Sequence, residues 1–226
     1  MAISEWTPPA RARPSAAYLG ETSPEPIYAA IGKATTQWEH NEVVLCRLFQ
    51  FFCETPSFAA SQVYGEPTGF AGRLALVQVA SDEFFLRRPE SIENLEQQAR
   101  ADALVRAFAQ ASFERNKIVH AMVSRPQPDT VELGYYLTPS YYSTKKRKFD
   151  LEEGWPMGGN YFYRSAEILR CFERFEDLLN EGMHLWLLLQ ETHGVPEGVQ
   201  YVPRVAAPQR LNHQGAIPPH RRAGEK

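Results

Sequence analysis

An arginine, an asparagine and a histidine stand close together in the segment FERNKIVHAM, residues 113–122. A histidine near its ordinary pKa can donate or accept a proton at neutral pH. An arginine can bind phosphoryl oxygens through charge-assisted hydrogen bonds. Asn116 and His120 are four residues apart, so on a helix the amide can orient the imidazole. Arg115, Asn116 and His120 are therefore candidate catalytic residues for proton transfer and charge stabilisation at a phosphate.

The segment comes late in a helix predicted over residues 92–124, and there a charge interrupts the apolar stripe. The stripe consists of Leu104, Phe108, Ala111, Arg115, Ile118 and Met122. A charge at such a position is costly unless it is paired or opens onto a cleft. The first predicted helix has a matching interruption at Asn41, which is flanked by Glu39 and Glu42. We expect the two interruptions to meet, with Glu42 or Glu39 holding the guanidinium of Arg115.

The spacing of Arg115 and His120 limits how they can act together. Five residues correspond to about 140° around an ideal helix, so the two side chains lie on either side of an edge. One phosphate can touch both only if the arginine curls around the helix. Alternatively, a second copy related by two-fold symmetry supplies one of them, which would create a composite cleft between the two chains of a homodimer.

The remaining pattern predicts a mainly α fold: a helical bundle with a small β-hairpin inserted before the last long helix. Apolar residues recur at helical spacing in the regions 25–52, 69–85, 92–124 and 160–192, and Ser91 is the expected N-cap of the third. Residues rich in β-formers occupy 131–137, 141–142 and 148–151. We expect one helical domain at 25–193, a flexible arm at 1–24 and a disordered Pro- and Arg-rich tail at 194–226.

Composition excludes several classes of protein. The 226 residues are 43% hydrophobic and carry a formal net charge of −3, so a basic nucleic-acid-binding surface could only be local. Cys46, Cys53 and Cys171 form no Cys-x-x-Cys pair, which supports neither a zinc site nor a disulfide framework, and no metal or cofactor is expected. The longest strongly apolar run, 185–189, is too short to cross a membrane, and the start of the chain lacks a signal peptide. A cytoplasmic location is expected.

The hexapeptide Arg115 to His120, RNKIVH, resembles the Arg-x4–6-His signature of the HEPN superfamily, in which a polar residue typically follows the arginine. The resemblance implies a helical-bundle homodimer. Many members are metal-independent endoribonucleases, often in toxin–antitoxin or phage-defence systems, and others are non-catalytic binding modules. By this resemblance His120 would be the general acid or base, Arg115 the phosphate clamp and Asn116 the orienting residue.

Two further features bear on that resemblance. His120 is followed by Ala121 and Met122, so the tyrosine of the Arg-x4-His-x-Tyr toxins is absent. A basic run beside two tyrosines could hold an RNA backbone, or it could be a solvated hairpin turn; it consists of Lys145, Lys146, Arg147 and Lys148. Three hypotheses follow: a HEPN-type ribonuclease that acts on RNA, with an antitoxin or defence protein as partner; a non-catalytic dimerisation or protein-binding module; and an unrelated helical bundle.

Overall fold

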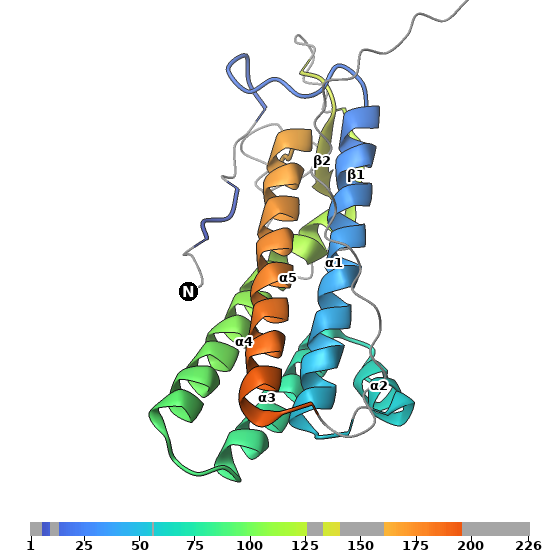
Figure 1. Ribbon diagram of the computed structural model, residues 1–226. Coiled ribbons are helices and arrows are strands. Elements are labelled where there is room, and N and C mark those ends of the chain that lie inside the picture. Colours follow the sequence, from blue (N-terminus) through green and yellow to red (C-terminus); the bar gives the residue numbers. More distant parts are fainter. Residues whose placement is uncertain (1–5, 10–13, 56, 126–132, 141–160, 196–226) are drawn as a thin grey trace, which may run out of the picture.

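The computed structural model describes residues 6–9, 14–55, 57–125, 133–140 and 161–195 (Figure 1). It confirms the predicted fold class, because it is mainly helical with a small antiparallel hairpin before the last long helix. The elements are α1 (Glu25–Phe52), α2 (Phe58–Gly65), α3 (Phe70–Leu86), α4 (Ile92–Val119), β1 (Ala121–Ser124), β2 (Tyr136–Pro139) and α5 (Ser165–His193). None of the described helices is long and apolar enough to cross a membrane.

Helices α1 and α5 lie side by side along the length of the molecule, and α3 and α4 complete the bundle (Figure 1). A glycine permits the close approach of the first pair. A Cβ added at Gly182 of α5 would overlap the Cγ1 atom of Val44 on α1. Glycine within a helix is unfavourable by about 1 kcal/mol relative to alanine, so at this position close packing offsets a weak helix propensity.

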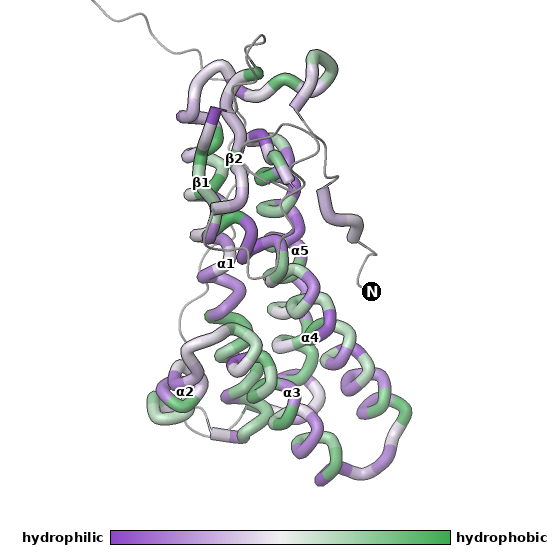
Figure 2. The backbone as a smooth tube through the Cα atoms, turned by 180° about the vertical axis from the view of Figure 1, so that it is seen from behind, coloured by the Kyte–Doolittle hydropathy of each residue, from purple (hydrophilic) through white to green (hydrophobic). Residues whose placement is uncertain are grey.

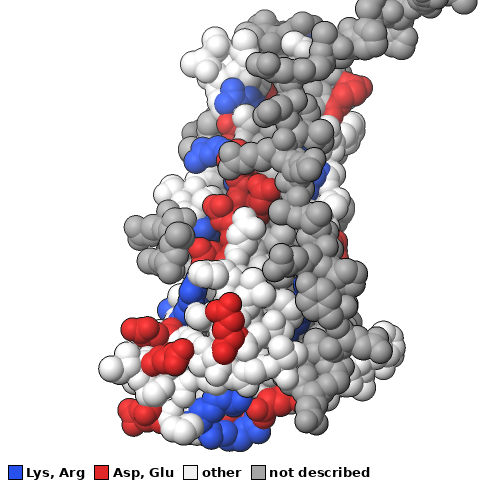
Figure 3. Space-filling view, in the orientation of Figure 1, with Lys and Arg blue, Asp and Glu red and all other residues white. Residues whose placement is uncertain are grey.

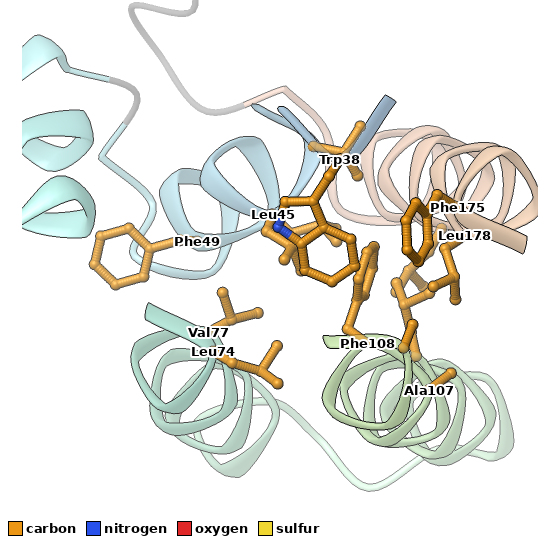
Figure 4. Packing of buried hydrophobic residues seen from close by; sticks show 14 of the residues in the cluster. Trp38, Leu45, Phe49, Leu74, Val77, Ala107, Phe108, Phe175 and Leu178 are labelled. Atoms are coloured by element: carbon orange, nitrogen blue, oxygen red, sulfur yellow. The ribbon is translucent and has the colours of Figure 1, made fainter. Parts of the chain in front are cut away.

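The core is centred on Trp38 of α1, which is fully buried. Figure 4 shows its ring beside those of Phe108 on α4 and Phe175 on α5. Its ring centroid lies 4.8 Å from that of Phe70, 6.3 Å from that of Phe108 and 5.0 Å from that of Phe175, each in an edge-to-face arrangement. This geometry is the one that aromatic quadrupoles favour. Trp38 therefore joins α1 to α3, α4 and α5 in a single cluster.

The caps at the ends of the helices agree with their local sequences. Ser91 is the N-cap of α4, as predicted, and its Oγ accepts a hydrogen bond from the backbone nitrogen of Asn94 at 3.1 Å. Ser57 does the same for α2 through the backbone nitrogen of Ala60 at 3.3 Å. Each hydroxyl satisfies one of the backbone donors that a helix leaves unpaired at its start.

The prediction that the helix capped by Ser91 extends to Ser124 is wrong. Helix α4 ends at Val119, and 121–124 form β1, which pairs antiparallel with β2 in a register that sets Met122 opposite Thr138. A backbone partner in β2 thus replaces the next helical turn for these residues. Leu137 also forms backbone hydrogen bonds in both directions with Tyr163, which lies two residues before the start of α5. The predicted β-segments at 141–142 and 148–151 lie outside the described residues.

The described residues 14–24 of the predicted flexible arm differ from that expectation, because part of this segment pairs with the hairpin. Glu21 and Tyr135 exchange two backbone hydrogen bonds, at 3.0 and 2.8 Å. The carboxylate of Glu21 also accepts hydrogen bonds from the backbone nitrogen (3.1 Å) and the hydroxyl of Ser165, in the first turn of α5. A carboxylate there complements the positive end of the helix dipole. Gly134, at φ 85°, allows the two backbones to approach.

At the end of the bundle opposite the hairpin, His193, the last residue of α5, contacts α4. A hydrogen bond of 2.9 Å joins its Nε2 to Oε1 of Gln97. Partial burial lowers the pKa of His193, and the positive charge of Arg88 lowers it further. The carboxylates of Glu54 and Glu93 act in the opposite direction. The unfolded chain therefore takes up the proton more readily than the folded chain does.

This shift predicts a loss of stability in mild acid. The contribution of His193 is present above its ordinary pKa of about 6.5 and declines as the pH falls toward the lower pKa of the folded state. The loss of stability is measured by urea unfolding of the wild type and of a His193→Gln variant at pH 7.5 and at pH 5. The variant should lose less stability between the two pH values, whereas His40→Gln, at an exposed position on α1, should behave as the wild type. Equal pH dependence in all three proteins would contradict the prediction.

Candidate functional site

The motif residues lie on the last turn and a half of α4, at the end of the bundle that carries the hairpin (Figure 1). Asn116 is exposed and still helical. His120 is also exposed and is the C-cap, and its backbone nitrogen donates to the carbonyl oxygen of Asn116 at 3.1 Å. The change from helix to strand at Ala121 therefore falls directly after the histidine.

The predicted pairing of Arg115 with an acid of the first helix is wrong. Arg115 is only half-buried, and its Nη1 donates to Oδ1 of the neighbouring Asn116 at 3.2 Å. It forms no ion pair with a described residue. Glu39 is exposed on α1 and likewise has no ion pair in the described part of the chain. The guanidinium of Arg115 therefore lies at the surface beside Asn116 and does not need a buried carboxylate as a partner.

Glu42 is buried, but it serves a different arginine. Its carboxylate accepts hydrogen bonds from Nε1 of Trp38 at 3.3 Å, the hydroxyl of Tyr64 at 3.0 Å and Nη1 of Arg73 at 3.0 Å. The guanidinium thus reaches it from α3 and not from α4. Asn41, the other expected member of the site, donates to the backbone carbonyl oxygen of Phe175 at 2.9 Å and so joins α1 to α5.

The buried acid near the motif is Glu114, which the sequence prediction missed. Only 3% of its surface is exposed. Its carboxylate accepts hydrogen bonds from Nζ of Lys117 at 2.5 Å and from the hydroxyl of Tyr163 at 2.9 Å. Burial raises the pKa of Tyr163, and the negative charge of Glu114 raises it further, so the phenol stays protonated and donates. We call these three residues the Glu114 network.

Cys171 lies close to the Glu114 network and is fully buried on α5. Burial raises the pKa of its thiol to about 12, and the negative charge of Glu114 acts in the same direction. A thiol of this kind is protonated at neutral pH and is a poor nucleophile. Cys171 is therefore a packing residue beside the network.

Two hydroxyl groups from outside α4 hold the backbone of the motif. The hydroxyl of Tyr161 donates to the carbonyl oxygen of Lys117 at 3.0 Å, and Oγ of Ser140 donates to the carbonyl oxygen of His120 at 2.7 Å. The last carbonyl groups of a helix have no partner within the helix, so these bonds satisfy acceptors that the end of α4 leaves open. The segments beside the hairpin thereby fix the backbone from which His120 projects.

Three apolar side chains close to the motif in sequence are exposed. Phe113 is 68% exposed, and Val119 and Met122 are also partly exposed. Within the described part of the chain no hydrogen bond joins the side chains of Asn116 and His120, and Oδ1 of the amide accepts from Arg115. The expected orientation of His120 by Asn116 is therefore not observed in this single chain.

Charge on the described surface is mixed. On the face drawn in Figure 3, Lys and Arg side chains are interspersed with Asp and Glu, so the described part of that face carries no continuous basic surface. Near the motif, Arg125 lies over the ring of Tyr135 with 5.8 Å between guanidinium carbon and ring centroid. The basic run, Lys145 to Lys148, lies outside the described residues. No group of three His, Cys, Asp or Glu residues among those described could hold a metal ion.

Comparison with known proteins adds no relative to this description. The chain matches no family model, no curated protein and no solved structure. The assignment of a function therefore rests on the motif and on the geometry described above.

Proposed function

We propose that the protein is a metal-independent endoribonuclease of HEPN type that acts as a homodimer. The observation that supports it best is the position of Asn116 and His120, both open to solvent at the end of α4, with the guanidinium of Arg115 bonded to the same amide. Three groups that can contact a phosphodiester are thus presented on one and a half turns of helix. The resemblance of RNKIVH to the HEPN signature supplies the reaction class.

The proposed reaction uses groups that RNA and the motif contain. The 2′-oxygen attacks the adjacent phosphorus and the bond to the 5′-oxygen breaks, which leaves a 2′,3′-cyclic phosphate and a free 5′-hydroxyl. His120 takes the proton from the 2′-hydroxyl, and a histidine in the acid form gives a proton to the departing 5′-oxygen. Arg115 binds the phosphoryl oxygens, whose negative charge grows in the transition state.

A dimer would explain how Arg115 and His120 can act on one phosphate although they diverge around α4. It would also cover the apolar residues exposed near the motif. Arg115 and His120 diverge around α4, so a second copy can supply the histidine that acts as the acid. Phe113, Val119 and Met122 are exposed near the motif and offer apolar contacts for a symmetric interface. The resemblance suggests that such an enzyme belongs to a toxin–antitoxin or phage-defence system with a partner protein, and the cysteine pattern favours the cytoplasm.

A non-catalytic dimerisation or protein-binding module is the second candidate. The same exposed apolar residues favour it, because they support association without chemistry. The Glu114 network also favours it, because the buried polar cluster of α4 stabilises the fold without involving Arg115 or His120.

Cleavage of labelled single-stranded RNA in the presence of EDTA tests the proposal. The wild type should cut RNA, and His120→Ala and Arg115→Ala should each lower the rate by about 100-fold or more. Matched controls are His40→Ala on α1 and Arg106→Ala, at an exposed position of α4, which should leave the rate unchanged. Equal cleavage by all five proteins, or by none, would rule out the proposal that this protein is a ribonuclease. Loss of a dimer in Phe113→Lys, with no cleavage by the wild type, would establish the second candidate.

A further inference from the structure

Helices α3 and α4 form an antiparallel pair whose outer surface is distant from the motif. Their register is marked by the side-chain amide of Gln78, whose Nε2 donates to Oδ1 of Asp82 at 2.8 Å and to Oδ1 of Asp102 on α4 at 2.9 Å. With Gln78 level with Asp102, antiparallel packing sets Asp82 near Gln98 and Phe85 near Leu95. Figure 2 shows the two helices meeting at the end of the molecule opposite the hairpin.

Each helix carries one row of residues beside the groove, at the spacing i, i+3, i+4 and i+7 that places side chains on one face. The hollow itself is lined by five residues of α3 and by Gln98 of α4. The rows are Val79, Asp82, Glu83 and Leu86 on α3, and Leu95, Gln98, Ala99 and Asp102 on α4. Large apolar side chains in these rows are widely exposed: Val79 by 67%, Leu86 by 79% and Leu95 by 51%. We call this surface the α3–α4 groove.

The α3–α4 groove is hollowed between its rows. A cavity of about 460 Å³ is lined by Val79, Asp82, Glu83, Phe85, Leu86 and Gln98. From Val79 to Leu86 it extends over two helical turns, about 10 Å. A third helix packs onto two others at an axial separation of about 8–10 Å, with its apolar stripe in the groove, so the size and shape suit an amphipathic helix.

The charge of the groove is negative. Asp82 and Asp102 converge on one neutral amide, and neither forms an ion pair with a described residue. Glu83 is paired only with Arg87 on its own helix, at 3.4 Å, in an exposed pair of small energetic value. A ligand that covers Val79 and Leu86 must therefore approach carboxylates that lack a strong cationic partner.

We propose that the α3–α4 groove binds a basic amphipathic helix of a partner protein. The apolar stripe of that helix covers Val79, Leu86 and Leu95, and its flanking Lys or Arg residues face Asp82 and Glu83. A second copy of this chain is a poorer occupant, because symmetric pairing would bring the carboxylates of two identical grooves together. This surface is independent of the proposed ribonuclease. His120 lies 25 residues beyond Leu95, a separation of about 37 Å along the helix axis, so a helix bound in the groove leaves the motif open.

Three synthetic 18-residue helical peptides with the same leucine stripe, flanked by Lys, Gln or Glu, serve as probes, with fluorescence anisotropy as the readout. The full chain should bind the Lys peptide at least ten-fold more tightly than the Glu peptide at low salt. The preference should shrink at about 0.5 M salt, where charges are screened. Equal affinity for the three peptides, or no binding of any, would overturn the proposal.

Variants locate the site. Leu86→Glu should weaken the Lys peptide about ten-fold or more, and Glu83→Lys should reverse the charge preference. Matched controls are Val63→Glu on α2 and Glu39→Lys on α1, also at exposed positions, which should bind as the wild type does. Circular dichroism on each variant confirms that it is folded. Equal weakening by Leu86→Glu and Val63→Glu would place binding elsewhere.

Two other occupants are separable outcomes. Sedimentation equilibrium of the wild type and of Leu86→Glu detects a second copy in the groove. A peptide of residues 196–226, which carries four of the chain's arginines, can be tested as a competitor of the Lys peptide. Self-association that Leu86→Glu removes, or displacement by the 196–226 peptide, would overturn the assignment to a partner protein. A monomeric protein from which the 196–226 peptide does not displace the Lys peptide would support that assignment.

Discussion

Replacing Trp38 with alanine should lower the free energy of unfolding by about 3–5 kcal/mol. The ring is fully buried and contacts aromatic rings from α3, α4 and α5, so its removal leaves a cavity at the point where four helices meet (Figure 4). It also leaves the carboxylate of Glu42 without one of its three donors. The change is measured by urea unfolding followed by circular dichroism.

Two further variants make the prediction specific. Phe58→Ala removes an aromatic ring that is exposed on α2 and should cost no more than about 0.5 kcal/mol. Trp38→Phe keeps most of the buried ring but loses the hydrogen bond to Glu42, so it should lie between Trp38→Ala and the wild type. A cost for Trp38→Ala similar to that for Phe58→Ala would show that the core is not organised around this residue.

Replacing Glu114 with alanine should lower the free energy of unfolding by about 2–3 kcal/mol. The carboxylate is the shared acceptor for Lys117 and for the fully buried Tyr163, and its loss leaves an ammonium and a phenol hydroxyl without their partner. Lys117 remains partly exposed and can recover some hydration, which keeps the cost at the lower end for a broken buried pair. Thermal and urea unfolding measure the change.

A matched control and a double-mutant cycle test the origin of this loss. Glu96→Ala makes the same chemical change at an exposed position of α4 and should be nearly neutral. Because Tyr163 donates to Glu114, the costs of Glu114→Ala and Tyr163→Phe should sum to more than the cost of the double variant. Strict additivity, or a Glu114→Ala variant as stable as Glu96→Ala, would argue against a cooperative network.

The fold class followed from the sequence because apolar residues recur at helical spacing over long segments, and because Pro, Gly and an N-cap serine mark several of their ends. The α1 stripe and the N-cap Ser91 depend on residues close in the chain, so local patterns suffice for them. The end of α4 did not follow. The segment 121–124 continues an apolar pattern that suits either a helix or a strand, and only its partner β2, on the far side of an intervening segment, decides between the two.

The sequence pattern at the end of α4 was read with the wrong side chain facing inward. After Ala111 the buried stripe of α4 steps by three to Glu114 and then by four to Ile118, whereas the prediction stepped by four to Arg115. One residue corresponds to about 100° of rotation, which is enough to exchange a buried acid for a half-exposed arginine. An acid and a lysine three residues apart, at 114 and 117, were the available local signal.

The partners of the Glu114 network could not be found by local reasoning. Tyr163 lies 49 residues from Glu114 along the chain, and Tyr161 lies 44 residues from Lys117. A tyrosine before a helix has no local feature that marks it as a partner for a distant carboxylate. Arg73, which donates to Glu42, is on a separate helix, and local sequence patterns could not predict this pairing either.

The docking of residues 20–21 on the hairpin has a consequence for the order in which the molecule assembles. Glu21 meets Tyr135 and Ser165 only after more than a hundred residues of chain have been brought together, and closing so long a loop costs conformational entropy. We therefore expect this end to acquire its structure after the packed helices and to open most readily by sub-global fluctuation. Amide hydrogens of β1 and β2 should then exchange with solvent sooner than those at the centre of α1. We therefore expect the histidine of the motif to project from a portion of the protein that opens more readily than the packed centre of the bundle.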